Sequence, residues 1–212
     1  MNYQLMLDKT LEELKIKGAR PSLLLQACCA PCSSYVLEYL CEFFDITLFF
    51  YNPNISPEKE YFFRAAELKR LVKEMPIENK PEIVICDYDN SSFFKMAKGM
   101  EDLPEGSQRC FLCYELRLEA AAKYAKEKNF DYFCTTLSIS PHKNAEKLNE
   151  IGEKMAKKYE KSYLFSDFKK KNGYKRSIEL SKKYDLYRQN YCGCVFSKAQ
   201  AKNDKSSQNY DK

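Results

Sequence analysis

The chain has 212 residues, of which 44% are hydrophobic and 14% aromatic, so it carries enough apolar surface to fold and is not a disordered polypeptide. Its 35 basic and 30 acidic residues leave a net charge of +5, and no apolar run approaches the ~20 residues of a membrane span. The first residues lack the layout of a secretory signal, so we expect a cytoplasmic protein with no membrane partner.

Hydrophobic periodicity predicts alternating helices and strands over the first two thirds of the chain. Ser56 and Pro57 have the residue types of an N-cap and a first helical position. Strands that alternate with helices are typical of a doubly wound α/β domain with a mainly parallel sheet. In chain order the predicted elements are helix 3–17, strand 23–27, helix 33–44, strand 46–51, a helix beginning at 56–58, strand 82–86, helix 92–98, helix 109–128 and strand 131–137.

The pattern changes after residue 137 to two basic amphipathic helices, 143–159 and 174–184, with no clear strand. We therefore divide the chain into an α/β core over 1–141, a helical basic segment over 142–200 and a flexible tail over 201–212. Residues 143–188 hold 14 basic and 7 acidic side chains, which leaves the rest of the chain slightly acidic. This asymmetry favours nucleic acid as a partner, although a solvated lysine-rich surface would have the same composition.

Ten cysteines and a single histidine are the most unusual part of the composition. Because the cytosol keeps thiols reduced, such an excess indicates metal binding or redox chemistry rather than structural disulfides. Three cysteines lie inside apolar helix or strand patterns and are expected to be core residues: Cys41, Cys86 and Cys134. The other seven form three short groups, namely Cys28, Cys29 and Cys32, then Cys110 and Cys113, then Cys192 and Cys194.

The positions of these groups suggest several kinds of chemistry. The first group follows a strand at the start of a helix, where open α/β sheets form their sites and where a thiolate is favoured. Four thiolates could hold zinc or an iron–sulfur cluster, as in a zinc-binding RNA-binding module or a redox enzyme. Cys29 and Cys32 could instead be the redox pair of a thioredoxin-like thiol–disulfide oxidoreductase. Cys192 and Cys194, separated by one glycine, could close a strained and labile disulfide.

Five motifs together resemble one known family. They are LQACCAPC at 25–32, YNPNI at 51–55, RCFLCY at 109–114, TTL with SP at 135–141, and YRQNYCGC at 187–194. In this order and over about residues 22–197 they are similar to the QueH family of epoxyqueuosine reductases. The resemblance implies an α/β fold akin to the adenine-nucleotide α-hydrolase-like (HUP) domains, with the first cysteine group in place of the pyrophosphate loop.

The resemblance also implies an activity and its residues. The enzyme would reduce epoxyqueuosine at the wobble position of tRNA to queuosine, with a 4Fe–4S cluster on Cys28, Cys29, Cys110 and Cys113. Cys192 and Cys194 match the family's redox-active pair. Cys32 matches a motif cysteine of open role, which could replace a cluster ligand or hold an additional adjacent metal ion. The expected partners are the anticodon loop of tRNA and an electron donor such as ferredoxin or flavodoxin.

Removal of an epoxide oxygen needs two electrons, two protons and the loss of water. Candidate proton donors or extra metal ligands are Asp167, Arg188, Tyr191 and His142. For the tRNA backbone, we expect phosphate contacts from Lys169–Lys171, Lys175 with Arg176, and Lys182 with Lys183. Interleaved tyrosines and phenylalanines are suited to stacking on unpaired anticodon bases.

Overall fold

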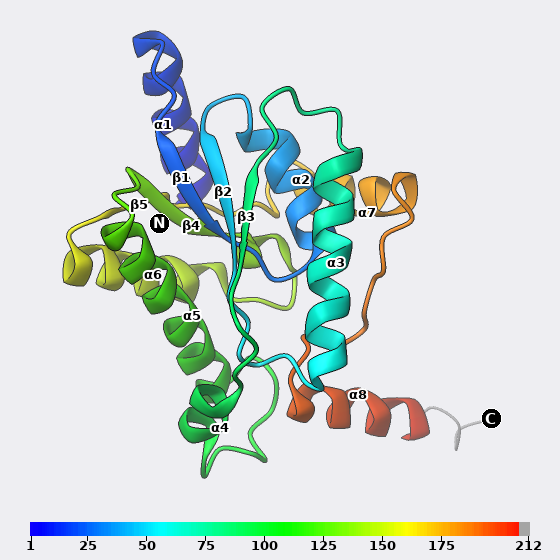
Figure 1. Cartoon of the computed structure of the whole chain (residues 1–212). Helices are drawn as coiled ribbons and strands as arrows, with labels where there is room; N and C mark the ends of the chain where they lie inside the picture. Colours follow the sequence, from blue (N-terminus) through cyan, green and yellow to red (C-terminus); the bar gives the residue numbers. More distant parts are fainter. Residues whose placement is uncertain (208–212) are drawn as a thin grey trace.

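The computed structural model describes residues 1–207 and shows an α/β fold with one five-stranded sheet between two layers of helices (Figure 1). The spatial order is β3-β2-β1-β4-β5, and every pair of neighbours is parallel. The predicted doubly wound class of HUP type is thus confirmed, and the sheet is parallel throughout. The strands are β1 (Ser22–Gln26), β2 (Asp45–Phe50), β3 (Glu82–Ile85), β4 (Tyr132–Thr135) and β5 (Ser162–Tyr163).

The two helical layers follow from the alternation of side chains along the central strand β1. Leu23 and Leu25 pack into one core with helices α1, α2 and α3, whereas Leu24 packs into the other with α5 and α6. Both faces of the strand are therefore buried, as is typical of parallel sheets. The helices are α1 (Tyr3–Lys17), α2 (Ala30–Leu40), α3 (Glu58–Glu74), α4 (Ser91–Ala97), α5 (Gln108–Glu127), α6 (Ala145–Tyr159), α7 (Gly173–Lys183) and α8 (Val195–Ser207).

The strand order reverses between β1 and β4, because the chain builds outward to β3 before it returns to β4. In open α/β sheets such a reversal leaves a crevice at the carboxyl ends of the two strands. Gln26 of β1 pairs with Thr135 of β4 at this edge, and a 3₁₀ turn over Thr136–Ile139 follows directly. Beside it, α4 and α8 form a small additional core around Phe93 and Ala97.

Two local features differ from the sequence-based expectation. The strand β5 was not expected, since two residues are too short to show an alternating pattern. The helix α3 begins at Glu58 with Pro57 as its N-cap residue, so the prediction of Ser56 as the cap is wrong. The flexible tail over 201–212 stays a prediction: α8 extends into it as far as Ser207, and 208–212 lies outside the described residues.

Of the three expected core cysteines, Cys134 is fully buried, whereas Cys41 and Cys86 are partly buried at the edge of the two main cores. Within residues 1–207, no helix has both the length and the hydrophobicity to cross a membrane.

The packing of α6 on β5 gives a test of the fold. A Cβ atom at Gly152 would lie 2.3 Å from the ring of Tyr163, which is itself packed against Phe133 and Phe165. Helix propensity favours Gly152→Ala by about 1 kcal/mol, but overpacking costs about 1–3 kcal/mol, so we expect a net loss of stability. Urea unfolding measures it, with the exposed neighbour Glu153→Ala as the control; a stabilised Gly152→Ala variant would contradict this packing.

Candidate active site

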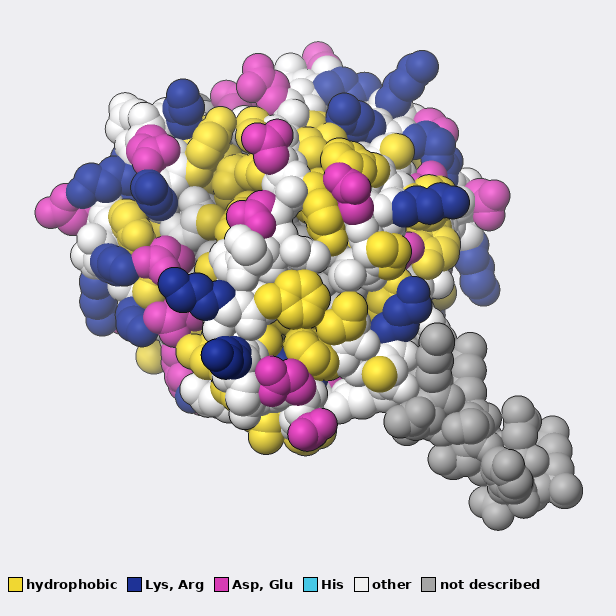
Figure 2. Space-filling view, turned by 60° about the horizontal axis from the view of Figure 1, so that its bottom comes forward, with side chains coloured by type: hydrophobic (Ala, Val, Ile, Leu, Met, Phe, Trp, Pro, Cys, Tyr) yellow, Lys and Arg dark blue, Asp and Glu magenta, His cyan; other side chains and the backbone are white. Residues whose placement is uncertain are grey.

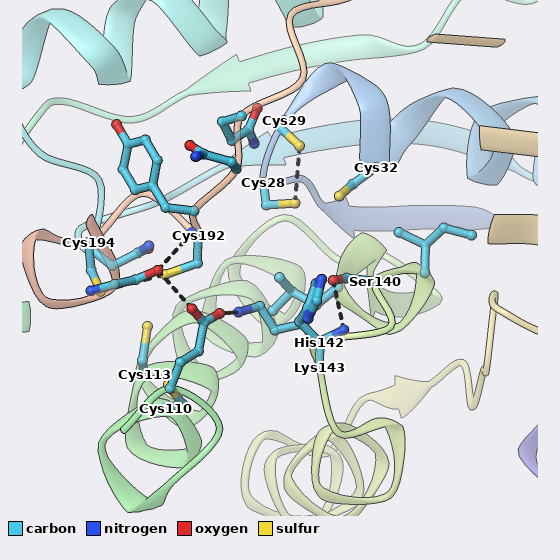
Figure 3. A pocket seen from close by; sticks show the side chains of 18 of the residues that line it. Cys28, Cys29, Cys32, Cys110, Cys113, Ser140, His142, Lys143, Cys192 and Cys194 are labelled. Carbon is cyan, nitrogen blue, oxygen red and sulfur yellow. Dashed lines mark hydrogen bonds and ion pairs between the residues drawn. The ribbon is translucent and has the colours of Figure 1, made fainter. Parts of the chain in front are cut away.

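A cavity of about 430 Å³ opens at the carboxyl ends of β1 and β4 and is lined by seven of the ten cysteines (Figure 3). They come from the start of α2, the start of α5 and the segment before α8, and they are the three groups defined from the sequence. The switch point of the sheet thus gathers thiols from positions more than 160 residues apart in the chain.

The first group forms the tightest cluster. The sulfurs of Cys28, Cys29 and Cys32 all lie within 4.8 Å of one another, and Cys28 Sγ is 3.7 Å from Cys29 Sγ. Cys29 is the N-cap residue of α2, and Pro31 fixes the first turn, so that Cys32 projects toward the other two. Three sulfurs at this spacing suit a thiophilic metal. Cys32, whose role the sequence leaves open, therefore lies with Cys28 and Cys29.

Of the three thiols of the first group, Cys28 is the one that ionises most readily. Hydrogen bonds from Cys29 and Cys32 hold the pKa of Cys28 well below its usual range, and the charge of Arg117 acts in the same direction. The hydrogen bond to Cys28, together with burial, raises the pKa of Cys29 to about 12. The pKa of Cys32 is raised by the same neighbours. The arrangement therefore favours a thiolate on Cys28.

A buried arginine supports this negative charge from α5. Arg117 donates from Nη2 to Asn52 Oδ1 at 2.5 Å, and no carboxylate among the described residues forms an ion pair with it. Gln26, which lies at the end of β1, accepts a hydrogen bond from Thr135 Oγ1 at 2.8 Å and so links the two central strands beneath the thiols. Burial of an unpaired cation costs free energy, so the charge of Arg117 is best balanced by an anion in the cavity.

The second group lies in the first turn of α5. Cys110 and Cys113 are each 8% exposed, and their spacing of three residues directs both toward the cavity. The backbone N–H of Gly106 donates to Cys110 Sγ at 3.3 Å. Burial raises the pKa of both thiols, and that of Cys113 to about 11. Such buried thiols stay protonated at neutral pH unless a metal ion binds them, because a bound metal ion displaces the proton.

The third group is a pair of reduced thiols in contact. Cys192 Sγ and Cys194 Sγ are 3.5 Å apart, and Gly193 between them has a φ of +114°, which favours glycine. Arg64 Nη1 donates to the carbonyl of Cys192 at 3.2 Å, and the N–H of Ser56 donates to the carbonyl of Gly193. The hydrogen bond between Cys192 and Cys194 and the charge of Lys143 lower the pKa of Cys192, despite its burial. The pair is thus held in one geometry with Cys192 favoured as thiolate.

The structure separates the four candidate proton donors. His142, Arg188 and Tyr191 line the cavity, whereas Asp167 does not. The Asp167 carboxylate instead lies 3.0 Å from Lys169 Nζ. Asp167 is therefore poorly placed as the extra metal ligand that the sequence suggested.

Five further charged residues line the cavity and could not be picked out as site residues from the sequence: Arg64, Glu105, Arg109, Arg117 and Lys143. Each lies in a helix or loop rich in charged residues, and only the fold shows which of these charges point inward. One available signal was the position of Arg117 four residues after Cys113, on the same face of a helix.

Comparison with known proteins identifies the family. The family described as epoxyqueuosine reductase QueH matches residues 23–200. A protein named epoxyqueuosine reductase QueH from Streptococcus pyogenes serotype M1 is 43% identical over 93% of this chain and 78% of its own length. Proteins with the same name from Staphylococcus epidermidis and Acinetobacter baylyi are 43% and 40% identical, over 93% and 97% of this chain and 84% and 94% of their own lengths.

The chain therefore belongs to the epoxyqueuosine reductase QueH family. The resemblance drawn from the five sequence motifs is confirmed, and so is the class of enzyme, an oxidoreductase of this type.

The lowered pKa of Cys192 gives a prediction about reactivity. Because the thiolate is the nucleophile, iodoacetamide at pH 7 should modify Cys192 faster than Cys86, whose pKa burial raises to about 11. Between pH 7 and pH 6 the rate at Cys86 should fall about tenfold, and that at Cys192 far less. Mass spectrometry of the tryptic peptides 189–198 and 74–95 separates the two sites in the reduced protein. An equal pH dependence at both sites would show that Cys192 is an ordinary thiol.

Proposed function

We propose that, as a member of the QueH family, this chain reduces epoxyqueuosine in tRNA to queuosine by using a 4Fe–4S cluster and a redox-active cysteine pair. The observation that carries the proposal is the convergence of seven thiols on one cavity at the switch point of the sheet. A tRNA substrate implies a cytoplasmic location, and the electrons would come from a donor such as ferredoxin or flavodoxin.

The donor set of the cavity fits the cluster. Cys28 and Cys29 would hold it from α2, and Cys110 and Cys113 from α5, since iron–sulfur clusters take cysteine thiolates as ligands. The uncompensated Arg117 beneath Cys28 is suited to the negative charge of such a group. Cys32 is the remaining thiol of the first group, and it could hold an additional metal ion beside the cluster. When bound, the cluster would supply single-electron transfer.

The reaction requires two electrons and two protons. Both bonds from the epoxide oxygen to carbon break, a carbon–carbon double bond forms, and the oxygen leaves as water. Oxidation of the Cys192–Cys194 dithiol to a disulfide releases two electrons and two protons, which balances this reduction. The two sulfurs lie 3.5 Å apart, so the partners of this bond are already in contact in the reduced protein.

Protons reach the departing oxygen from groups on the cavity wall. His142 and Tyr191 line it and can donate, whereas the guanidinium of Arg188 can hold the substrate by hydrogen bonds but does not release its proton. Arg188 also donates to Ser181 Oγ at 3.0 Å, which fixes it at the mouth of the cavity. We assign Arg188 to substrate positioning and His142 and Tyr191 to proton supply.

The two alternatives from the sequence are less well supported. For a thioredoxin-like reaction, Cys29 and Cys32 would need one thiolate at neutral pH, but the pKa values of both thiols are raised. A zinc-binding RNA module would use four of the thiols and leave three more in the same cavity without a role.

The lysines proposed to contact tRNA differ in their availability. Lys169 pairs with Asp167 and donates to Ser138 O, and Lys171 pairs with Asp8. The other lysines of the set form no ion pair with any described residue, namely Lys170, Lys175, Lys182 and Lys183. Figure 2 shows that the face at the bottom of Figure 1 carries hydrophobic groups with both signs of charge between them, rather than a uniformly basic surface. We therefore place the phosphate contacts chiefly at these four unpaired lysines, and test the adjacent pair Lys182 and Lys183.

Variants of two cysteine groups test the cluster and the redox pair separately. Protein prepared without oxygen should be brown with roughly four irons or slightly more per chain, and Cys110→Ala or Cys113→Ala should bleach it. Cys192→Ser and Cys194→Ser should keep iron and tRNA binding but lose most turnover, because a single thiol cannot cycle. Iron assay, visible spectrum and single-turnover assay are run on each, with the core variant Cys134→Ala as control. Full colour in both alanine variants would refute the ligand assignment, and lost iron in the serine variants would make that pair a ligand.

A second test concerns tRNA. Substitution of both Lys182 and Lys183 by Gln should weaken tRNA binding and reduce the slope of log affinity against log salt by about one to two. The matched control replaces Lys154 and Lys158 by Gln, since both are paired with glutamates of α5. An unchanged slope in the first variant would show that these lysines only solvate the surface.

A further inference from the structure

An ion pair on the cavity wall lies beside the redox pair and has no part in the function proposed above. Lys143, in the loop before α6, has a side chain only 10% exposed, and its Nζ lies 2.6 Å from Glu105 Oε1. Both residues line the same cavity as Cys192 and Cys194, and Figure 3 shows the labelled lysine there. The Glu105 side chain is 30% exposed, so this pair is not removed from water; what distinguishes it is its place beside the two cysteines.

The glutamate connects this ion pair directly to the cysteine pair. Glu105 Oε2 accepts a hydrogen bond from Ser197 Oγ at 2.7 Å. Ser197 Oγ in turn accepts from the N–H of Cys192 at 3.2 Å, and the N–H of Ser197 donates to Cys194 Sγ at 3.3 Å. One continuous chain of contacts therefore runs from Lys143 through Glu105 and Ser197 to both cysteines.

The same glutamate also fixes the position of α8. Its backbone N–H donates to Gln200 Oε1 at 3.1 Å, and Gln200 Nε2 donates to Leu103 O at 3.3 Å. On the opposite side, Arg64 and Ser56 hold the carbonyls of Cys192 and Gly193. Because the segment is held on both sides, the two charges of the ion pair keep a fixed position relative to the cysteine sulfurs.

We propose that Lys143 and Glu105 are positioning residues that set the redox equilibrium of the Cys192–Cys194 pair, with opposite signs. This inference rests on the proposed function, in which that pair cycles between dithiol and disulfide. The reduced pair can carry a thiolate, and the disulfide is neutral. A cation close by therefore stabilises the reduced form, and an anion close by stabilises the oxidised form.

Equilibration with glutathione measures the reduction potential of the Cys192–Cys194 pair, because the thiol–disulfide exchange between them is balanced. One glutathione disulfide oxidises the dithiol, the Cys192 Sγ–Cys194 Sγ bond forms, and two glutathione thiols carry away the two electrons and two protons. The holoenzyme is equilibrated anaerobically over a range of glutathione ratios, and remaining thiols are trapped with N-ethylmaleimide. The tryptic peptide 189–198 contains both cysteines of the pair and no other, so its mass reports the disulfide fraction.

The variants are expected to shift the equilibrium in opposite directions. Lys143→Gln should favour the disulfide about tenfold, which lowers the reduction potential by about 30 mV. Glu105→Gln should favour the dithiol by a similar factor, because the lysine then acts without its counter-charge. Lys143→Arg should resemble the wild type. The matched control is Lys147→Gln, which removes an exposed lysine of α6 that pairs with Glu150.

The outcomes separate this inference from the proposed function. If the wild type forms the disulfide but neither variant differs from it, or if both shift in the same direction, the inference is wrong and the redox role stands. If the wild type forms no disulfide at any ratio, the redox role fails and the inference fails with it. If Lys143→Gln does not fold, as judged by circular dichroism and iron content, the direction of the Glu105→Gln shift decides the matter.

Discussion

The pairing of β1 with both β2 and β4 is the constraint on which the rest of the structure depends. This pairing places β1 at the centre of the sheet. At the carboxyl end of β1, the connections to the neighbouring strands pass to opposite faces of the sheet. The thiols at the start of α2 therefore lie in a crevice that neighbouring helices do not fill. The starts of α5 and α8 border the same crevice and bring the remaining thiols to it.

Charge balance around these thiols follows from that arrangement. The cavity wall holds Arg64, Arg117 and Lys143, and the glutamates Glu60 and Glu105 pair with the first and the last of these. Hydrogen bonds with neighbouring thiols, aided by the positive charges, lower the pKa values of Cys28 and Cys192, whereas burial raises the pKa of Cys113. The same wall thus provides both ionised and neutral thiols, which suits a site that combines metal ligation with electron transfer.

The sequence allowed the fold class and four of the five strands to be predicted, because β1, β2 and β4 are short apolar runs between predicted helices and turns. It also allowed the three thiol groups to be found, since their spacing is visible in the chain. It could not place Asp167 outside the cavity or Lys143 inside it. Both residues lie among many charged residues in the chain, and only the fold determines which of these side chains face the cavity. Nor did it show β5, whose two residues are too few to give an alternating pattern, although they pair in parallel with Tyr132 and Phe133 of β4.

The assembly of the cavity from distant segments has a consequence for folding. The cavity brings together segments that are far apart in the chain, around Cys28, Cys110, Lys143 and Cys192. Contacts between such segments close long loops, which costs conformational entropy, so we expect them to form after the local helices and the β1–β2 pairing. During that interval the seven thiols are exposed to solvent and to one another. The rate of folding then determines how much of the chain is lost to wrongly paired disulfides under oxidising conditions, and the reducing state of the surroundings becomes a requirement for the yield of native protein.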